Sequence, residues 1–308
     1  MTIPRAPGNT APITDAEVWA REWNALANAN LLLPKITHSK YFSDLDVGTI
    51  VHIPNEPTLT FQTGLTIGQE IPSTPVVVTE TILEIKRYGA FKIPLSDIDA
   101  ELSYMDLPAM YQSGSIRAAN EGIETQFFAD IGQYAHAKNK GATAGNKSSA
   151  YDLGVSGAGI AVNSANVQEY LLRFVACLKE FNRSSGQITI PVPTWMWVKL
   201  MLSGMKVASD MGDSTSIYRT GQIGAIAGNV FVAESTLLNG AGTAAATPTE
   251  ILAFNPSAVA YTQRMKKQTK IQDGNLNTIL TIGIVYDWGV PQPEGLVQGF
   301  AYSAAEPA

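Results

Sequence analysis

The sequence predicts an α+β fold in which a long β-ribbon is followed by a long helix. Apolar and polar residues alternate from Val76 to Tyr88, which is the two-residue period of a strand. Apolar residues then recur at three- and four-residue steps from Leu107 to Ala137, which is the period of a helix. The remaining chain mixes shorter helices with strands and ends in a hairpin.

The stretch Val76 to Tyr88 is predicted to be the returning arm of the ribbon. Its thirteen residues would span roughly 43 Å at about 3.3 Å each, whereas an isolated two-stranded ribbon is barely stable in water. The outgoing arm covers Val47 to Ile53 and continues through Leu59 and Phe61, and residues 60–75 form an irregular tip. We therefore expect the ribbon to lie against another copy of the chain.

A connector from Gly89 to Leu102 is expected to lead to the long helix, with Asp106 as its N-cap. Glycines 114, 122 and 132 lie inside the apolar stripe, and each costs about 1 kcal/mol relative to alanine. We expect a close backbone contact or a bend at these positions. Taken by itself, this element would also suit the core helix of an enzyme.

The N-terminal part predicts a loose proline-rich segment followed by a capped helix that Pro34 ends. Trp19 and Trp23 lie on one side of this helix and need a surface to cover. Docking on the body of the same chain and docking on a neighbouring subunit both remain open.

Composition narrows the class of protein. The 308 residues suffice for two sub-domains, and only 16% are charged, against about 25% in ordinary domains. Much of the surface is therefore expected to be covered by partners. A net charge of -6 argues against a DNA reader that neutralises phosphates but suits an acidic wall near DNA. No secretion signal or membrane span is found, which predicts cytoplasmic folding, and Cys177 is expected to be a buried, inert thiol.

The second half predicts a mixed sub-domain and a closing hairpin. Residues Lys138 to Ser164 are expected to form a flexible surface loop at a sub-domain boundary, and Asn239 to Thr249 a mobile one. Thr194 is expected to cap a helix. The other expected elements are a helix at Val167 to Phe181, strands at Gln187 to Val192, Asn229 to Ala233 and Ile251 to Phe254, and hairpin arms at Lys267 to Ile271 and Thr278 to Asp287 around a turn at Asp273, Gly274 and Asn275.

No catalytic, metal or cofactor site is predicted. The glycine-rich stretch Gly141 to Ser149 lacks the spacing of a phosphate loop, because Asn146 separates glycine from lysine. The three histidines are scattered, and the paired aspartates suit caps and turns better than acid–base chemistry. A basic cluster is the one candidate for nucleic-acid contact, although a solvated or subunit-facing strand is the favoured explanation: Arg264, Lys266, Lys267 and Lys270.

Three stretches carry a resemblance to a known family: Leu83 to Ile93, Gly224 to Val232, and Thr281 to Val290 followed by Pro293 and Glu294. With the order of the predicted elements, they resemble the HK97-fold major capsid proteins of tailed double-stranded DNA bacteriophages. The resemblance covers most of the chain. It implies an N-terminal arm at residues 1–43, an extended E-loop hairpin at 44–88, a peripheral (P) domain with a spine helix at 89–162, an axial (A) domain at 163–250, and a return to the P domain with a terminal hairpin at 251–308.

The resemblance implies a structural protein that is not an enzyme and needs no cofactor. Its copies would assemble into pentamers and hexamers of an icosahedral capsid around genomic DNA, without sequence-specific DNA binding or membrane contact. A portal protein is an implied partner, a separate scaffolding protein is favoured because no long extension precedes the fold, and a decoration protein can be accommodated. The tip at residues 60–75 has no lysine, which argues against lysine-based crosslinking from this loop. The implied location is the virion capsid, after synthesis in the host cytoplasm.

Two alternatives remain open. An encapsulin-like compartment shares this architecture, and a neighbouring gene for a cargo enzyme would favour it. An α+β hydrolase is the alternative from another class, and turnover by a purified monomer would favour it. For the capsid interpretation, the predicted contacts between subunits are Trp19 and Trp23 on the arm, Phe61, Glu80, Glu84, Lys86 and Arg87 on the hairpin, and Asp273, Gly274 and Asn275 at the terminal turn.

Overall fold

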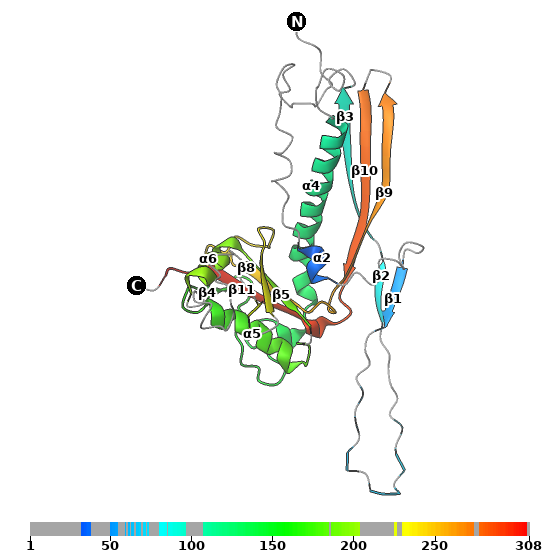
Figure 1. Ribbon diagram of the computed structural model, residues 1–308. Helices are drawn as coiled ribbons and strands as arrows, with labels where there is room; N and C mark the ends of the chain where they lie inside the picture. The colour runs from blue at the N-terminus through cyan, green and yellow to red at the C-terminus, as the bar shows by residue number, and fades with distance from the viewer. Residues whose placement is uncertain are drawn as a thin grey trace.

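The structure is a computed structural model with two bodies and a projecting ribbon (Figure 1). It describes residues 32–37, 50–54, 80–84, 86–96, 107–184, 186–203, 225–226, 230–273 and 277–306, together with single residues and short runs between 59 and 73. A helix and a three-stranded sheet form the elongated body. A six-stranded sheet with two helices forms the other, to one side of it.

The elongated body is built on a three-stranded antiparallel sheet. Its strands are β3 (Arg87–Ser96), β9 (Ala260–Asp273) and β10 (Asn277–Gly289), in the order β3-β10-β9. The predicted hairpin is therefore confirmed, with longer arms. The predicted connector from Gly89 is wrong up to Ser96, because β3 pairs with β10 from Arg87 to Ser96. Gly89 and Pro94 suggested a break, yet Pro94 lies on an outer strand of this sheet, where proline is tolerated.

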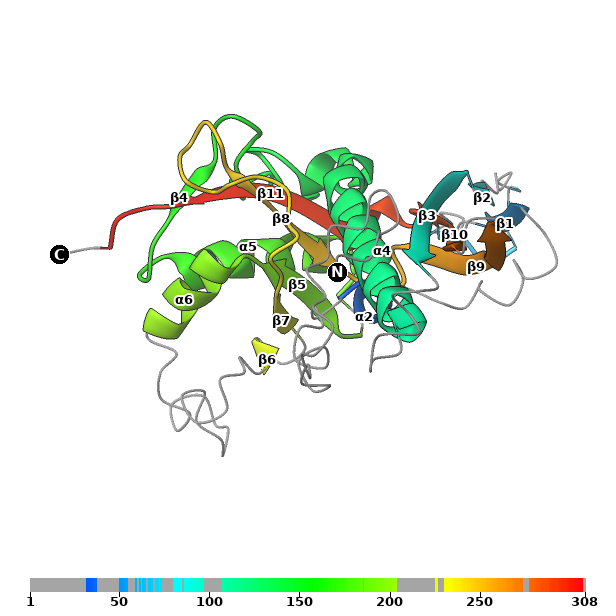
Figure 2. The ribbon, with the colours of Figure 1, turned by 90° about the horizontal axis from the view of Figure 1, so that it is seen from above.

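Helix α4 (Leu107–Asp130) runs along one face of this sheet (Figures 1 and 2). It begins at the predicted residue but ends seven residues before Ala137, in two 3-10 turns, η2 (Ile131–Tyr134) and η3 (Ala137–Asn139). Gly132 lies in the first of these turns, where a Cβ atom would overlap Oε1 of Glu250. The expected close contact is confirmed there, whereas a Cβ atom at glycine 114 or 122 would meet nothing within 4 Å.

The second body is a mixed six-stranded sheet in the order β4-β11-β8-β5-β7-β6. Helix α5 (Val167–Glu180) and helix α6 (Thr194–Leu202) lie on one side of it (Figure 2). Its strands are β4 (Ile160–Val162), β5 (Ile188–Val192), β6 (Ala225–Ile226), β7 (Val230–Glu234), β8 (Thr249–Phe254) and β11 (Leu296–Ser303), the last preceded by the 3-10 turn η6 (Pro293–Gly295). The predicted helix and the three predicted strands of this region are confirmed, to within two residues at each end.

Two loop predictions are wrong. The stretch 138–164 contains β4, which pairs in parallel with β11, and it buries Leu153 completely. Its turns are held by backbone bonds such as Gly145 N to Lys138 O at 2.7 Å. The stretch 239–249 is also tied to the sheet, because Gly242 O accepts a hydrogen bond from Ser303 N at 2.9 Å. Glycine and alanine suggested mobility, whereas here they allow close packing of backbone.

Two local predictions also differ. Pro34 lies inside the short helix α2 (Leu33–Ile36) instead of ending a helix, since proline is acceptable in a first turn, where its missing N–H has no partner anyway. The N-cap of α6 is Pro193. The hydroxyl of Thr194 instead donates to Glu234 Oε1 at 2.7 Å.

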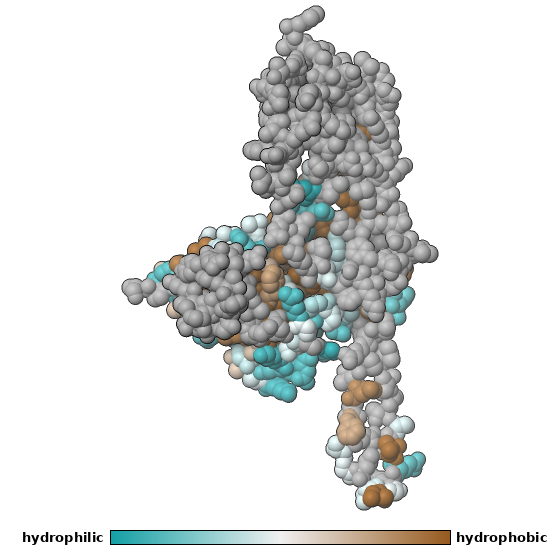
Figure 3. All heavy atoms as spheres, viewed as in Figure 1, coloured by the Kyte–Doolittle hydropathy of each residue, from teal (hydrophilic) through white to brown (hydrophobic). Residues whose placement is uncertain are grey.

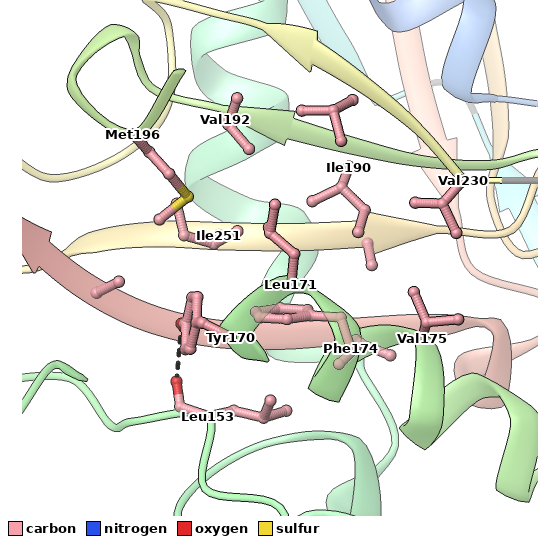
Figure 4. Close-up of a cluster of buried hydrophobic side chains, with 14 of the residues drawn as sticks. Leu153, Tyr170, Leu171, Phe174, Val175, Ile190, Val192, Met196, Val230 and Ile251 are labelled. Carbon is pink, nitrogen blue, oxygen red and sulfur yellow. Dashed lines mark hydrogen bonds between the residues drawn. The ribbon is translucent and has the colours of Figure 1, made fainter. Parts of the chain in front are cut away.

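The core has two parts. One lies between α5, α6 and the six-stranded sheet, where Tyr170 and Phe174 pack edge to face and the Tyr170 hydroxyl donates to Leu153 O at 3.1 Å (Figure 4). The other joins α4 to both bodies through Phe127, which contacts the rings of Phe254 and Trp288. Helix α4 thus anchors the two bodies to one another.

Candidate assembly surfaces

A two-stranded ribbon projects from one end of the elongated body, on the side away from the six-stranded sheet (Figures 1 and 2). It consists of β1 (Ile50–Pro54), β2 (Glu80–Glu84) and the described residues between them, and it is called the ribbon below. The strands pair antiparallel, with Ile50 opposite Glu84 and Pro54 opposite Glu80. Two strands alone seldom hold their shape in water, so a ribbon of this kind needs a surface to lie against.

The ribbon carries large apolar side chains that its own chain leaves uncovered. Phe61 is 88% exposed, Leu59 and Ile71 are each 70% exposed, and Ile67 is completely exposed. Ile82 on β2 adds a further half-exposed side chain. Figure 3 shows hydrophobic atoms on the far part of this projection, clear of the bodies. Exposed apolar groups at this density along one projection mark a surface for another protein.

The charged residues predicted as contacts on the ribbon make short local ion pairs. Glu80 lies 3.1 Å from His52 Nδ1 across the two strands, and Lys86 lies 2.9 Å from Glu84. All four side chains are more than one-third exposed, so these pairs add little to stability. Hydrogen bonding to Glu84 raises the pKa of Lys86. Their contact with another subunit stays a prediction.

Arg87 fixes the root of the ribbon to the elongated body. Its guanidinium donates to Asp287 Oδ1 at 2.5 Å and to Asp130 Oδ2 at 2.8 Å, and it lies 3.6 Å above the ring of Trp288. Asp287 also accepts from the backbone N–H of Lys86 at 3.0 Å, and the Trp288 indole donates to Asp130 at 2.9 Å. These four side chains, Arg87, Asp130, Asp287 and Trp288, form a cluster called the root clasp below.

The remaining predicted contact residues are partly beyond the described residues. Asp273 ends β9 and pairs with Asn277 at the start of β10. Trp19, Trp23, Gly274 and Asn275 lie outside the described residues. Arg87 is bonded to the body of its own chain, and its role between subunits stays a prediction as well.

Sequence reasoning missed the buried carboxylate of Glu124. Its two oxygens accept the backbone N–H of Leu32 at 3.1 and 3.2 Å, and the residue is almost fully buried. Burial raises the pKa of Glu124 to about 7, against the effect of the hydrogen bonds from Leu32 and Leu33. A glutamate inside the apolar stripe of α4, between Ile123 and Phe127, was the available signal.

The described residues bear on the sequence predictions about metals, membrane spans and the single cysteine. No group of three or more metal-binding side chains occurs among them, and none of their helices is long and apolar enough to span a membrane. Cys177 is buried as predicted, and burial raises the pKa of its thiol to about 12. The basic residues 264, 266, 267 and 270 lie on β9, at the outer edge of the three-stranded sheet.

Comparison with known proteins identifies the fold. No protein-family model and no curated protein sequence matches the chain. A solved structure from Mycobacterium phage Che8 matches at 19% identity with a TM-score of 0.70, over 95% of this chain and 98% of that chain. The capsid of cyanophage P-SCSP1u matches at 14% identity and 0.67, over 96% and 94%.

An encapsulin from Synechococcus elongatus, SrpI in its holo complex, matches at 10% identity with a TM-score of 0.52, over 95% and 92% of the two chains. The α+β chain therefore has the HK97-like capsid fold, and its likeness to the phage structures is greater than its likeness to this encapsulin.

Proposed function

We propose that the chain is a major capsid protein, a structural protein whose copies assemble into pentamers and hexamers of an icosahedral phage shell. The observation that carries this proposal is the ribbon, whose large apolar side chains project from the folded bodies without cover. A second copy of the chain is the partner that a repeating shell supplies. The shared fold with phage capsid structures supports the same conclusion.

The ribbon explains why assembly would be favourable. Burying one large apolar side chain contributes about 1.5–3 kcal/mol, and four of them lie in the described part of the tip at Leu59, Phe61, Ile67 and Ile71. The root clasp limits how far the ribbon can swing, so less conformational entropy is lost when it docks. Because only 16% of the residues are charged, contacts between copies of the chain also require little free energy to remove charged groups from water.

The proposal assigns roles to the parts of the chain. The ribbon corresponds to the extended E-loop (residues 44–88), except that Arg87 and Tyr88 already belong to β3. Helix α4 with the three-stranded sheet corresponds to the P domain with its spine helix. The six-stranded body corresponds to the A domain at 163–250, except that β4, the end of β8 and β11 extend it into residues 160–162, 251–254 and 296–303. The turn around Gly274 would meet neighbouring capsomers, and residues 1–43 would form the arm.

The partners follow from the same proposal. The shell encloses double-stranded DNA without reading its sequence, which suits a chain of net charge -6, since it would not trap the DNA during packaging. A portal protein occupies one vertex, a separate scaffolding protein assists assembly, and a decoration protein can bind the finished surface. The chain is made in the host cytoplasm and resides in the virion capsid.

Electron microscopy of the expressed protein tests the proposal, with and without the co-expressed genes that neighbour it. Closed shells that contain DNA when packaging genes are present are the expected result. Shells that enclose a protein cargo instead would favour the encapsulin-like alternative. A monodisperse monomer, with the ribbon folded onto its own body in small-angle scattering, would contradict both, and turnover by that monomer would favour the hydrolase alternative.

A further inference from the structure

The first described segment of the chain, residues 32–37, is held by apolar packing and by one buried carboxylate. Leu32, Leu33 and Ile36 are buried against α4 and its neighbours, and they form one turn of helix there. The N–H of Leu32 is directed between both oxygens of Glu124, 92 residues further along the chain. This segment is called the entry segment below, because residues 1–31 join the body through it.

We propose that Glu124 is a proton-controlled latch that holds the entry segment on α4 and releases it as the solution becomes alkaline. The geometry supports a latch because Glu124 is only 1% exposed and accepts a hydrogen bond from the backbone N–H of Leu32. A buried N–H group needs an acceptor inside the protein, and here Glu124 provides it. Opening of the entry segment would expose Glu124 to water. The latch concerns the folded chain and does not depend on shell assembly.

The direction of the pH effect follows from burial. Removal from water raises the pKa of Glu124 to about 7, above the ordinary 4.5 that it would regain in the open segment. A group with the higher pKa in the closed state binds its proton more tightly there, so the closed state is favoured fully below pH 4.5. That preference is lost as the pH rises through about 7, where the carboxylate ionises while still buried.

Neighbouring groups do not oppose this direction. Tyr261 on β9 is buried nearby, and its pKa is raised by burial, by Tyr286 and by the charge of Glu124. Tyr286 on β10 donates its hydroxyl to Gln126 at 2.6 Å. On α4 itself, Arg117 lies 3.7 Å from Glu121, and Asp130 is paired with Arg87 in the root clasp. Among the described side chains, the charges near this part of α4 are thus committed to other partners.

Hydrogen–deuterium exchange of residues 32–37 in the full-length chain tests the latch between about pH 5 and pH 8, with rates corrected for intrinsic exchange. The opening constant of the wild type should rise about 50-fold to 100-fold over this range. Glu124→Gln keeps a carbonyl acceptor for Leu32 but cannot ionise, so its opening constant should stay constant with pH.

Glu121→Gln is the matched control, because Glu121 lies one turn away on the same helix and its removal should leave the wild-type profile unchanged. A flat profile in the wild type overturns the proposal, and so does an unchanged slope in Glu124→Gln. If Glu124→Gln does not fold, the test uses the wild type and Glu121→Gln. An opening constant that rises with pH in both proteins supports the latch, and a flat wild-type profile overturns it.

Discussion

Arg87 shows how a single side chain can set the direction of a projecting element. Its guanidinium joins β3 to α4 through Asp130 and to β10 through Asp287, and it stacks on Trp288. Lysine could not reproduce this arrangement, because it lacks the planar fork that serves two carboxylates and a ring at once. The two carboxylate partners lie 43 and 200 residues further along the chain. No local pattern in the sequence could reveal them.

Replacement of Arg87 by Met should lower the free energy of unfolding by about 2 kcal/mol, because it leaves the buried carboxylate of Asp287 without its cation. Urea denaturation of the unassembled chain measures this. Lys86→Met is the matched control: its neighbouring ion pair is solvent-exposed, so the unfolding midpoint should hardly move. Equal effects of the two substitutions would show that the ion pairs of the root clasp add no more to the free energy of unfolding than an exposed ion pair does.

At the scale of elements, α4 contains glycines in two different settings. A Cβ atom at Gly122 would meet nothing within 4 Å, so Gly122→Ala should stabilise the chain by about 0.5–1 kcal/mol through its better helix propensity. Gly132 lies just beyond the helix, and a Cβ atom there would overlap Glu250 and approach Gln298 Nε2 to 2.6 Å. Gly132→Ala should therefore destabilise by about 1–3 kcal/mol.

Thermal unfolding of these two alanine variants shows whether their changes in stability have opposite signs. The buried pair beside Gly132 has little freedom to move aside, because Gln298 donates to Glu250 at 2.6 Å and Asn239 donates to the other oxygen of that carboxylate at 3.3 Å. Stabilisation by both substitutions would show that the site around Gly132 accepts a methyl group without strain.

The same elements show what the sequence could predict. Helix α5 buries Val167, Tyr170, Leu171, Phe174 and Leu178. Its apolar residues all lie on one face of the helix, so the face that packs on the core can be predicted from the sequence. The hairpin of β9 and β10 was also visible in its alternation and turn residues. Strand β3 was missed, because it contains Gly89 and Pro94 and its pairing with β10 is long-range. Glu124 and the root clasp were missed for the same reason, since burial and partner choice arise only when distant segments meet.

For the whole molecule, the arrangement separates folding from assembly. Both parts of the core lie in the two bodies, and among the ribbon residues whose burial is described only Ile53 is buried. The exposed residues of the ribbon therefore add little to the stability of one chain, whereas they supply much of the apolar surface open to a partner. Damage to the ribbon should consequently affect assembly without affecting folding.

Combined replacement of Phe61 and Ile67 by Ser tests this separation. Analytical ultracentrifugation should show loss of shells and accumulation of smaller species, while the thermal unfolding midpoint of the unassembled chain stays within about 2 °C of the wild type, since a substitution far from the core rarely changes the unfolding free energy by more than about 0.5 kcal/mol. Leu172→Ser is the matched control, because Leu172 is a half-exposed apolar residue on α5, away from the ribbon. Shells of normal yield from the ribbon variant would contradict the proposed docking. Two large apolar side chains that the contact is proposed to bury would then not be needed for assembly.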